Sequence, residues 1–362
     1  MPARELVVLG TSSAVPTRHR NHSGHLLRWD GEGLLVDPGE GTQRQMLLAG
    51  VAASTVDVIA LTHEHGDHVL GLPGVLQRRA MDGLAAPVPL VFPAAAAPLV
   101  EHLLGAAAHA AALAVPCRVE DDGPVRGPDG APLRVGGAVL HAVALDHRVP
   151  AFAYRLVEPD GRRMLPEALA ARGVAGPDVG RLQREGVLAT PDGTVRLAEV
   201  SEHRAGQVVA LVQDTRWCDG ALAAAAGVDL LVCEATFADA DAALAPTYGH
   251  LTARQAGRLA AAAGARRLVL THFSSRYPDV APLLAQAREE HDDVVAAADL
   301  ERHAVPSRRC AGRLVSDEAA SPCRPSAAPR GRARRARRRA PPPPRRCSRS
   351  WGCRRRRRPP GG

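Results

Sequence analysis

Residues 61–68 read LTHEHGDH and place three imidazoles and the carboxylate of Asp67 within six positions, directly after the apolar run 56–61. Side chains alternate along a strand, so His63 and His65 are expected to point the same way, with a loop turning Asp67 and His68 toward a second point nearby. Imidazole nitrogen suits zinc, and carboxylate oxygen can terminate or bridge metal ions. The stretch predicts a metal site, in preference to a solvated polar loop.

These four side chains cannot complete the shells of two metal ions, so other parts of the chain must contribute. Three polar residues each follow directly after an apolar run: His147 after residues 138–145, Asp214 after residues 208–213 and His272 after residues 268–271. One such histidine alone is more often structural, but three in register with residues 63–68 favour ligands. Two ions about 3.5–4 Å apart could then share Asp214 and activate one water.

Short β-rich apolar runs alternate with Ala/Leu-rich stretches, the pattern of an α/β protein whose site lies at strand ends. The predicted strands are residues 6–9, 33–36, 56–61, 88–92, 138–145, 208–213, 230–234 and 268–271. The predicted helices are residues 43–48, 98–108, 220–226, 253–263 and 280–290.

The net charge of +8 is unevenly distributed over the 362 residues, whose 46 basic side chains are all arginine. Residues 308–362 hold 19 arginines against Asp317 and Glu318, a net of +17, so the remaining 307 residues carry −9. This Arg/Pro-rich tail has almost no large apolar residues and is expected to be disordered. It would either add non-specific RNA affinity or reflect a GC-rich reading frame, and the second interpretation is preferred.

We expect no export signal or membrane segment in this chain. Residues 6–9 are too short for a signal-peptide core, and prolines interrupt the uncharged residues 83–100. Seven cysteines include no C-x-x-C pair and form no disulfide framework, which fits a reducing cytoplasm. Residues 158–206 are rich in Gly, Pro and Arg with weak periodicity, which indicates an inserted arm within a domain of residues 1–307.

The run at residues 63–68 is the signature of the metallo-β-lactamase fold, an αββα sandwich, and so implies that α/β architecture. Four further motifs make the chain resemble the ribonuclease Z (tRNase Z) family, in its short form, from Val7 to about residue 305. They are residues 37–45 (DPGEGTQRQ), 214–216 (DTR), 249–253 (GHLTA) and 271–277 (THFSSRY). The resemblance implies a zinc-dependent endoribonuclease that removes the 3′ trailer of precursor tRNA and leaves a 3′-hydroxyl on the tRNA.

The resemblance also implies roles for individual residues. Two zinc ions per subunit would be bound, although this mixed N/O set also suits Mn²⁺. One ion would be held by His63, His65 and His147, the other by Asp67, His68 and His272, with Asp214 bridging. Asp67 would also act as general base, His250 would protonate the leaving 3′ oxygen, and Glu234 would keep that histidine charged. This chain has Cys233 where the family usually has histidine, but it retains the adjacent Glu234.

Two segments resemble tRNA-contacting parts of the family. Residues 16–21 resemble the Pro-x-Lys-x-Arg-Asn loop, which implies contacts from Arg18, Arg20 and Asn21; the alternative is a solvated basic turn. Residues 173–186 resemble the Gly-Pro motif of the flexible arm. The residues implied there are Gly176, Pro177, Arg181 and Arg184, and the alternative is a tolerated surface insertion. Family members of this length pair as homodimers, in which one subunit's arm presents tRNA to its partner's site.

Two other functions compete with this interpretation. A relative acting on small phosphodiesters or sulfate esters would share the ligands but would need neither the arm nor the loop at residues 16–21. A non-catalytic RNA-binding scaffold should have lost ligands, and all seven are present. The sequence leaves open where cleavage falls relative to the CCA end, whether exonuclease activity accompanies it, and which metal is physiological.

Overall fold

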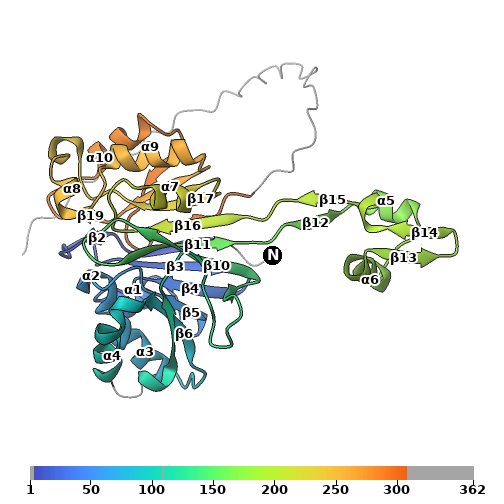
Figure 1. The fold of residues 1–362 in the computed structure, drawn as a ribbon, viewed down its shortest axis with the longest axis horizontal. Helices are drawn as coiled ribbons and strands as arrows, with labels where there is room; N and C mark the ends of the chain where they lie inside the picture. The colour runs from blue at the N-terminus through green and yellow to red at the C-terminus, as the bar shows by residue number, and fades with distance from the viewer. Residues whose placement is uncertain (1–3, 108–109, 308–362) are drawn as a thin grey trace, which may run out of the picture. The chain divides into compact units, whose positions relative to one another are not determined.

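Two β-sheets face each other in the computed structural model, which describes residues 4–107 and 110–307 (Figure 1). The seven-stranded sheet has the order β21-β1-β3-β4-β5-β6-β7, and the eight-stranded sheet has the order β20-β18-β17-β16-β11-β10-β8, with β9 paired to β10. The strands of the first sheet are β1 (Glu5–Gly10), β3 (Gly24–Trp29), β4 (Glu32–Val36), β5 (Val58–Ala60), β6 (Val88–Pro93), β7 (Ala114–Val119) and β21 (Arg302–Ala304). Those of the second are β8 (Gly123–Pro124), β9 (Arg134–Val135), β10 (Ala138–Leu145), β11 (Ala151–Val157), β16 (Val208–Val212), β17 (Leu230–Glu234), β18 (Leu268–Thr271) and β20 (Val294–Ala296). The described chain also contains the short parallel pair β2 (Ser12–Ser13) and β19 (Phe273–Ser274).

The alternation of side chains along β1 explains the layering. Leu6 and Val8 pack between the two sheets, whereas Val7 and Leu9 pack on the outer face of the first sheet. Each is fully buried, and burying one such side chain stabilises the fold by about 1.5–3 kcal/mol. Strands with two apolar faces require helices on the outside of the sandwich.

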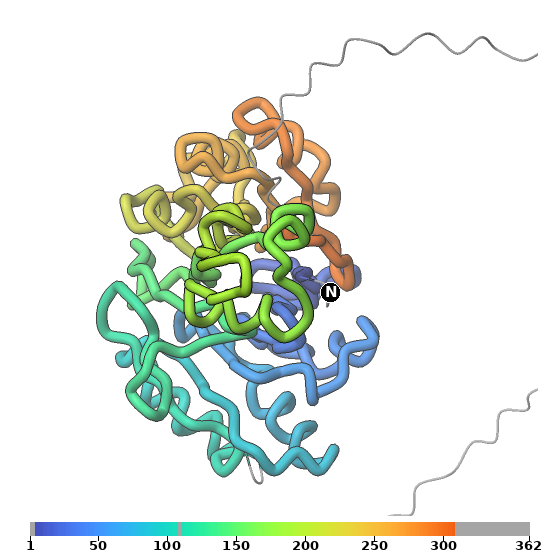
Figure 2. Tube along the Cα trace, turned by 90° about the vertical axis from the view of Figure 1, so that its right-hand side faces the viewer, coloured from blue at the N-terminus to red at the C-terminus, as the bar shows by residue number. Residues whose placement is uncertain are grey.

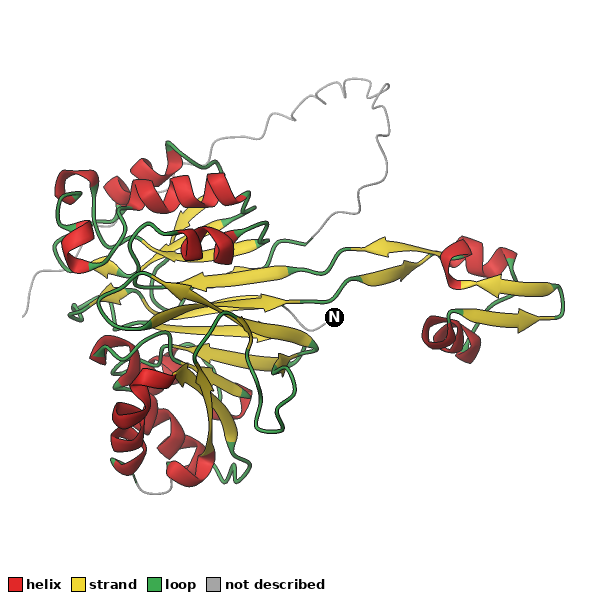
Figure 3. Ribbon diagram, viewed as in Figure 1, coloured by secondary structure: helices red, strands yellow, loops and turns green. Residues whose placement is uncertain are grey.

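Helices cover both outer faces, as Figure 3 shows in red. The first sheet is covered by α1 (Thr42–Leu48), α3 (Leu72–Met81) and α4 (Ala97–Gly105), and the second by α7 (Asp219–Ala225), α9 (Ala253–Ala263) and α10 (Ala281–Arg288). The shorter α2 (Gly66–Val69) and α8 (Ala245–Tyr248) lie in connections. The layer order is αββα, as expected from the sequence.

Parallel strands bring the polar residues to one end of the sandwich. In the first sheet β4 pairs in parallel with β5, and in the second β16, β17 and β18 are parallel. Side chains that follow these strands therefore meet at their carboxyl ends, where open α/β sheets bind ligands.

Residues 158–206 contain an arm with its own small core. The antiparallel strands β12 (Gly161–Met164) and β15 (Ser201–Arg204) extend from β11 and β16, and they lead to α5 (Pro166–Ala171), α6 (Pro177–Glu185), β13 (Val187–Thr190) and β14 (Gly193–Arg196). Figure 2 shows the arm from its far end. Leu169, Val174, Leu182, Leu188, Val195 and Val200 form its buried cluster.

The predicted elements all occur, with small changes of boundary. The strand predicted at residues 56–61 is limited to Val58–Ala60, and the helix at residues 253–263 has the predicted ends. Several elements were not predicted, among them β3, β11 and α3. The expected tail at residues 308–362 lies outside the described residues. In the described ranges, no helix has the length and apolar character needed to cross a membrane.

Candidate metal centre

Segments that follow strands of both sheets supply the clustered side chains. The prediction that His63 and His65 lie on a strand is wrong: β5 ends at Ala60, and both residues lie in the following loop. The strand ends there because the backbone N–H of Thr62 donates to the side chain of Asp37, instead of continuing the ladder. Asp67 and His68 then lie in the single turn of α2, not in a loop.

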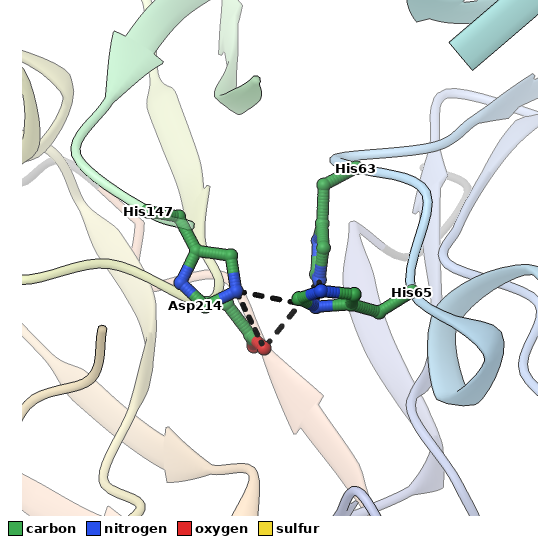
Figure 4. Close-up of side chains that lie close together, drawn as sticks. All are labelled: His63, His65, His147 and Asp214. Atoms are coloured by element: carbon green, nitrogen blue, oxygen red, sulfur yellow. Dashed lines mark hydrogen bonds and ion pairs between the residues drawn. The ribbon is translucent and has the colours of Figure 1, made fainter. Parts of the chain in front are cut away.

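His63, His65, His147 and Asp214 form the first group, and Figure 4 shows them pointing toward one another. Nδ1 of His65 lies 3.0 Å from Nε2 of His63 and 3.2 Å from Nε2 of His147. One donor atom from each of the four residues lies within 4.8 Å of all the others. Three imidazole nitrogens and one carboxylate oxygen therefore converge on one point.

Asp67, His68 and His272 form the second group. The Nε2 atoms of His68 and His272 are 3.2 Å apart, and Oδ2 of Asp67 lies 3.4 and 3.5 Å from them. The backbone of His272 has a positive φ of 59°, which is uncommon for a non-glycine residue and is found where surrounding structure fixes a functional side chain.

Asp214 connects the two groups. Its Oδ2 lies 3.5 Å from Nε2 of His63 and 3.8 Å from Nε2 of His147, whereas its Oδ1 lies 3.4 and 3.2 Å from Nε2 of His68 and His272. One carboxylate oxygen thus faces each group, the geometry that a bridging ligand requires. Asp214 is 3% exposed and its Oδ1 has no hydrogen-bond donor in the described part of the chain.

Hydrogen bonds behind the first-sheet histidines fix their tautomers. Asp37 accepts Nδ1–H of His68 at 2.9 Å and the hydroxyl of Thr62 at 2.7 Å. Because the Thr62 proton is used in this way, its oxygen accepts Nδ1–H of His63 at 3.0 Å. Both imidazoles therefore present Nε2 to the cluster, as in carboxylate–histidine–metal arrangements.

The second-sheet histidines are held in the same manner. Thr236 donates its hydroxyl proton to Glu234 at 2.6 Å and accepts Nδ1–H of His272 at 3.0 Å. His147 donates Nδ1–H to the carbonyl of Gly249 at 2.8 Å. Gly249 has φ +80°, and a Cβ there would lie 2.7 Å from Nδ1 of His147, so the close approach requires glycine.

These residues fit divalent metal ions. With Nδ1–H of four imidazoles donated outward, their Nε2 lone pairs point at one another and at the buried oxygens of Asp214. Facing lone pairs and an unpaired buried carboxylate oxygen are unfavourable unless a cation lies between them. Burial lowers the pKa of His65 and of His147 to about 4, which keeps both neutral and able to bind a metal.

His250 and Glu234 form a buried ion pair beside the cluster. Nδ1 of His250 lies 3.1 Å from Oε1 of Glu234, which also accepts the backbone N–H of Thr215 at 2.7 Å. Burial favours the neutral imidazole, but the carboxylates of Glu234 and Asp214 outweigh it and raise the pKa of His250 to about 9. His250 is thus a proton donor at neutral pH.

A helix cap positions His250. The hydroxyl of Thr252 accepts the N–H of Gln255, and the Gln255 side chain accepts the N–H of Thr252, so α9 begins at Ala253. A capping residue of this kind contributes about 0.5–2 kcal/mol. The cap fixes the chain two residues beyond His250.

The loop at residues 16–21 differs from a solvated basic turn. The guanidinium of Arg20 donates to the carbonyls of Ser274 and Tyr277, and Asn21 donates its side-chain N–H to the carbonyl of Glu40. Arg20 therefore holds the loop against the segment that carries His272, and Asn21 holds it against the connection that follows β4. Arg18 is exposed.

The arm residues lie on and beside α6. Gly176 precedes the helix with φ +56°, Pro177 occupies its first turn, and Arg181 and Arg184 are exposed. Arg181 contacts Glu185 one turn further along at 3.2 Å.

Sequence reasoning missed three of the supporting residues, Asp37, Thr62 and Thr236. Asp37 could have been found, because it follows directly after the apolar run 33–36 in the same way as the ligands follow theirs. The two threonines carry no comparable signal.

The chain is similar in sequence to known proteins. A family model described as anti-Pycsar protein Apyc1 matches residues 4–114. Ribonuclease Z of Nocardia farcinica is 54% identical over 311 residues, covering 85% of this chain and 100% of that protein. Ribonuclease Z of Streptomyces avermitilis is 53% identical over 310 residues, with the same coverage of 85% and 100%.

Solved structures share the fold. The metallo-β-lactamase fold protein YhfI of Bacillus subtilis superposes with a TM-score of 0.59 at 18% identity, covering 83% of this chain and 98% of that one. The short form of human tRNase Z superposes with a TM-score of 0.56 at 24% identity, covering 84% and 100%. The expected αββα sandwich of the metallo-β-lactamase fold is confirmed.

Proposed function

The chain belongs to the ribonuclease Z family, and from that premise we propose that it removes the 3′ trailer of precursor tRNA with the His/Asp cluster as its catalytic centre. The observation that carries the proposal is Asp214, whose two oxygens face two separate groups of donors. A hydrolase that cleaves a phosphodiester with two metal ions needs such a shared ligand.

The donor set supports a divalent metal, and we assign two zinc ions per subunit. His63, His65 and His147 would hold one ion, and Asp67, His68 and His272 the other, with Asp214 shared. Imidazole-rich sites suit zinc, while the carboxylates also admit Mn²⁺. When bound, such ions lower the pKa of water and neutralise charge on phosphate oxygens.

Asp67 is positioned to act as general base. Its Oδ2 accepts the backbone N–H of Ala14 at 2.7 Å, which fixes the carboxylate beside His68 and His272. Burial opposes ionisation, but the charge of His68 in its protonated form and hydrogen bonds from His272 and His68 lower the pKa of Asp67 below its usual value, so Asp67 is ionised at neutral pH. The carboxylate then takes the proton of the attacking water.

His250 serves as general acid. Its Nδ1–H is donated to Glu234, which leaves Nε2 as the atom that gives a proton to the leaving oxygen. The bond between phosphorus and the 3′ oxygen breaks, and the proton produces the 3′-hydroxyl of the tRNA while the phosphate stays on the trailer. Glu234 is fully buried and keeps the imidazolium charged.

The substrate contacts lie at two places. Arg18 supplies an exposed guanidinium on the loop that Arg20 and Asn21 hold in place. Arg181 and Arg184 supply two more on the arm, beside Gly176 and Pro177. Arginine binds phosphate in a bidentate way, and backbone charge supplies most of the affinity for RNA.

Two finer assignments complete the proposal. The enzyme acts in the cytoplasm and forms a homodimer in which one arm serves the partner's site. Pairing is supported by Leu47, Leu48 and Met81 on the adjacent helices α1 and α3, whose side chains are exposed although they are apolar. Light scattering on the purified protein tests the dimer.

Mapping of the product ends tests the function. The purified protein with Zn²⁺ is incubated with a precursor tRNA that lacks an encoded CCA end, and both product ends are determined. We expect cleavage after the mature tRNA sequence, a 3′-hydroxyl on the tRNA and a 5′-phosphate on the trailer. Hydrolysis of small phosphodiesters without any cleavage of precursor tRNA would contradict the proposal and support a small-ester hydrolase.

A further inference from the structure

A hollow of about 440 Å³ opens beside His250, within the range of about 300–1,000 Å³ typical of ligand pockets. Its lining includes His250, Thr236, Phe237 and Tyr248. Arg148 and Arg276 also line it, and neither has a carboxylate partner among the described residues. The hollow is therefore part aromatic and part cationic.

The position of His250, the proposed general acid, indicates which part of the substrate enters this hollow. In the proposed reaction His250 protonates the 3′ oxygen that leaves phosphorus, so the nucleoside carrying that oxygen must lie beside the imidazole. We propose that the hollow binds this nucleoside, the last one of the mature tRNA, with its base stacked on Tyr248. The inference rests on the proposed function and extends it from the scissile bond to a base-binding subsite.

Three rings form a row that leads outward from the proton donor. The ring centroid of Phe237 lies 6.0 Å from that of His250 and 6.1 Å from that of Tyr248. Phe237 is buried at 4% exposure and supports the row, whereas Tyr248 is 43% exposed. An exposed aromatic ring held on a buried one is a preformed platform for an unpaired base, because every base has a π face.

Arg148 and Arg276 suit the phosphate backbone of the RNA that enters the hollow with the base. Arg148 directly follows His147, and Arg276 lies in the segment that Arg20 fastens to the loop at residues 16–21. Both guanidinia are exposed and unpaired in the described ranges, in contrast to Arg254 and Arg266, which bind carboxylates. They are placed to contact the phosphates that flank the nucleoside.

Steady-state kinetics on two precursor tRNAs test the proposal. One precursor is intact, and the other is abasic at the last nucleotide of the mature tRNA. Loss of base stacking weakens binding, so Tyr248→Ala should raise KM for the intact precursor about tenfold, with a smaller effect on kcat. Tyr248→Phe should recover most of the loss, because it retains the ring. Trp217→Ala is the matched control, since Trp217 is 41% exposed but does not line the hollow.

The abasic precursor separates stacking from a structural effect. If the base stacks on Tyr248, the abasic precursor should have a raised KM with the unaltered enzyme, and Tyr248→Ala should add less than a twofold change. An equal increase in KM on both precursors would overturn the subsite. The proposed function is judged separately, because it fails only if the unaltered enzyme does not cleave the intact precursor.

Discussion

Asp214 links the two donor groups, so its removal should affect both metal positions at once. Asp214→Ala should abolish precursor cleavage and reduce the bound metal below two ions per chain, as measured by elemental analysis. Asp192→Ala, which removes an exposed carboxylate of the arm, is the control for loss of charge. Near-normal activity with two bound metal ions would show that Asp214 does not bridge.

His250 can be tested through the leaving group. His250→Ala should slow precursor cleavage by about 10²–10⁴-fold, the usual contribution of a positioned proton donor. A ribose hydroxyl leaves poorly without a proton, whereas p-nitrophenolate leaves readily, so hydrolysis of bis-p-nitrophenyl phosphate should decrease far less. Metal content should stay unchanged. An equal loss on both substrates would contradict the role of general acid.

The ion pair between Glu234 and His250 predicts how the rate of precursor cleavage depends on pH. The pKa of His250 is raised to about 9, so the protonated acid is present below that pH and is lost as the pH rises through it. Glu234→Gln removes the nearest anion and should lower this pKa. The decline in the rate of precursor cleavage should therefore move to lower pH. Glu289→Gln, on an exposed carboxylate, should leave the profile in place.

The sequence predicted the candidate ligands better than their supports, for a reason that lies in strand register. Each ligand follows an apolar run, which is visible in the chain itself. Asp37 reaches Thr62 because Val36 pairs with Ala60, and Glu234 adjoins His272 because Glu234 pairs with Thr271. Such pairings join residues far apart in sequence and are not encoded locally.

At the scale of elements, α3 shows how local signals can hide a helix. Its sequence contains Pro73 and Gly74, which normally disfavour helices, but both lie in the first turn, where proline is tolerated. The sequence indicates the arm only as an irregular insertion. Its core has no long periodic segment, because short helices and a hairpin supply one or two buried side chains each.

Excision of the arm tests its role in substrate binding, and the pairing of β12 with β15 defines which residues to remove. Met164 and Ser201 are cross-strand partners in β12 and β15, so a short Gly-containing turn can replace residues 165–200 and remove the whole arm core. Excision should raise KM for precursor tRNA and leave hydrolysis of bis-p-nitrophenyl phosphate largely unchanged. Loss of both activities in a protein with an unchanged thermal transition would contradict the role of the arm in substrate binding.

At the scale of the whole molecule, the candidate metal centre draws its side chains from both sheets. His63, His65, Asp67 and His68 follow a strand of the first sheet, whereas His147, Asp214 and His272 follow strands of the second. Metal ions held by these residues would therefore cross-link two layers that are otherwise held by the apolar core between them. The protein should therefore be measurably more stable with bound metal than without it.

Metal removal should reveal this link in thermal unfolding. Any ion that binds only the folded state stabilises it by mass action, by about 4 kcal/mol when its free concentration is 1,000-fold above its Kd. Chelation should therefore lower the Tm by several degrees, and Zn²⁺ should restore it. In Asp214→Ala the increase on adding Zn²⁺ should be smaller, because neither group retains its shared oxygen. In His250→Ala it should be retained, since that side chain is assigned to proton transfer. An increase that is the same in Asp214→Ala as in the unaltered protein would place the stabilising metal elsewhere in the molecule.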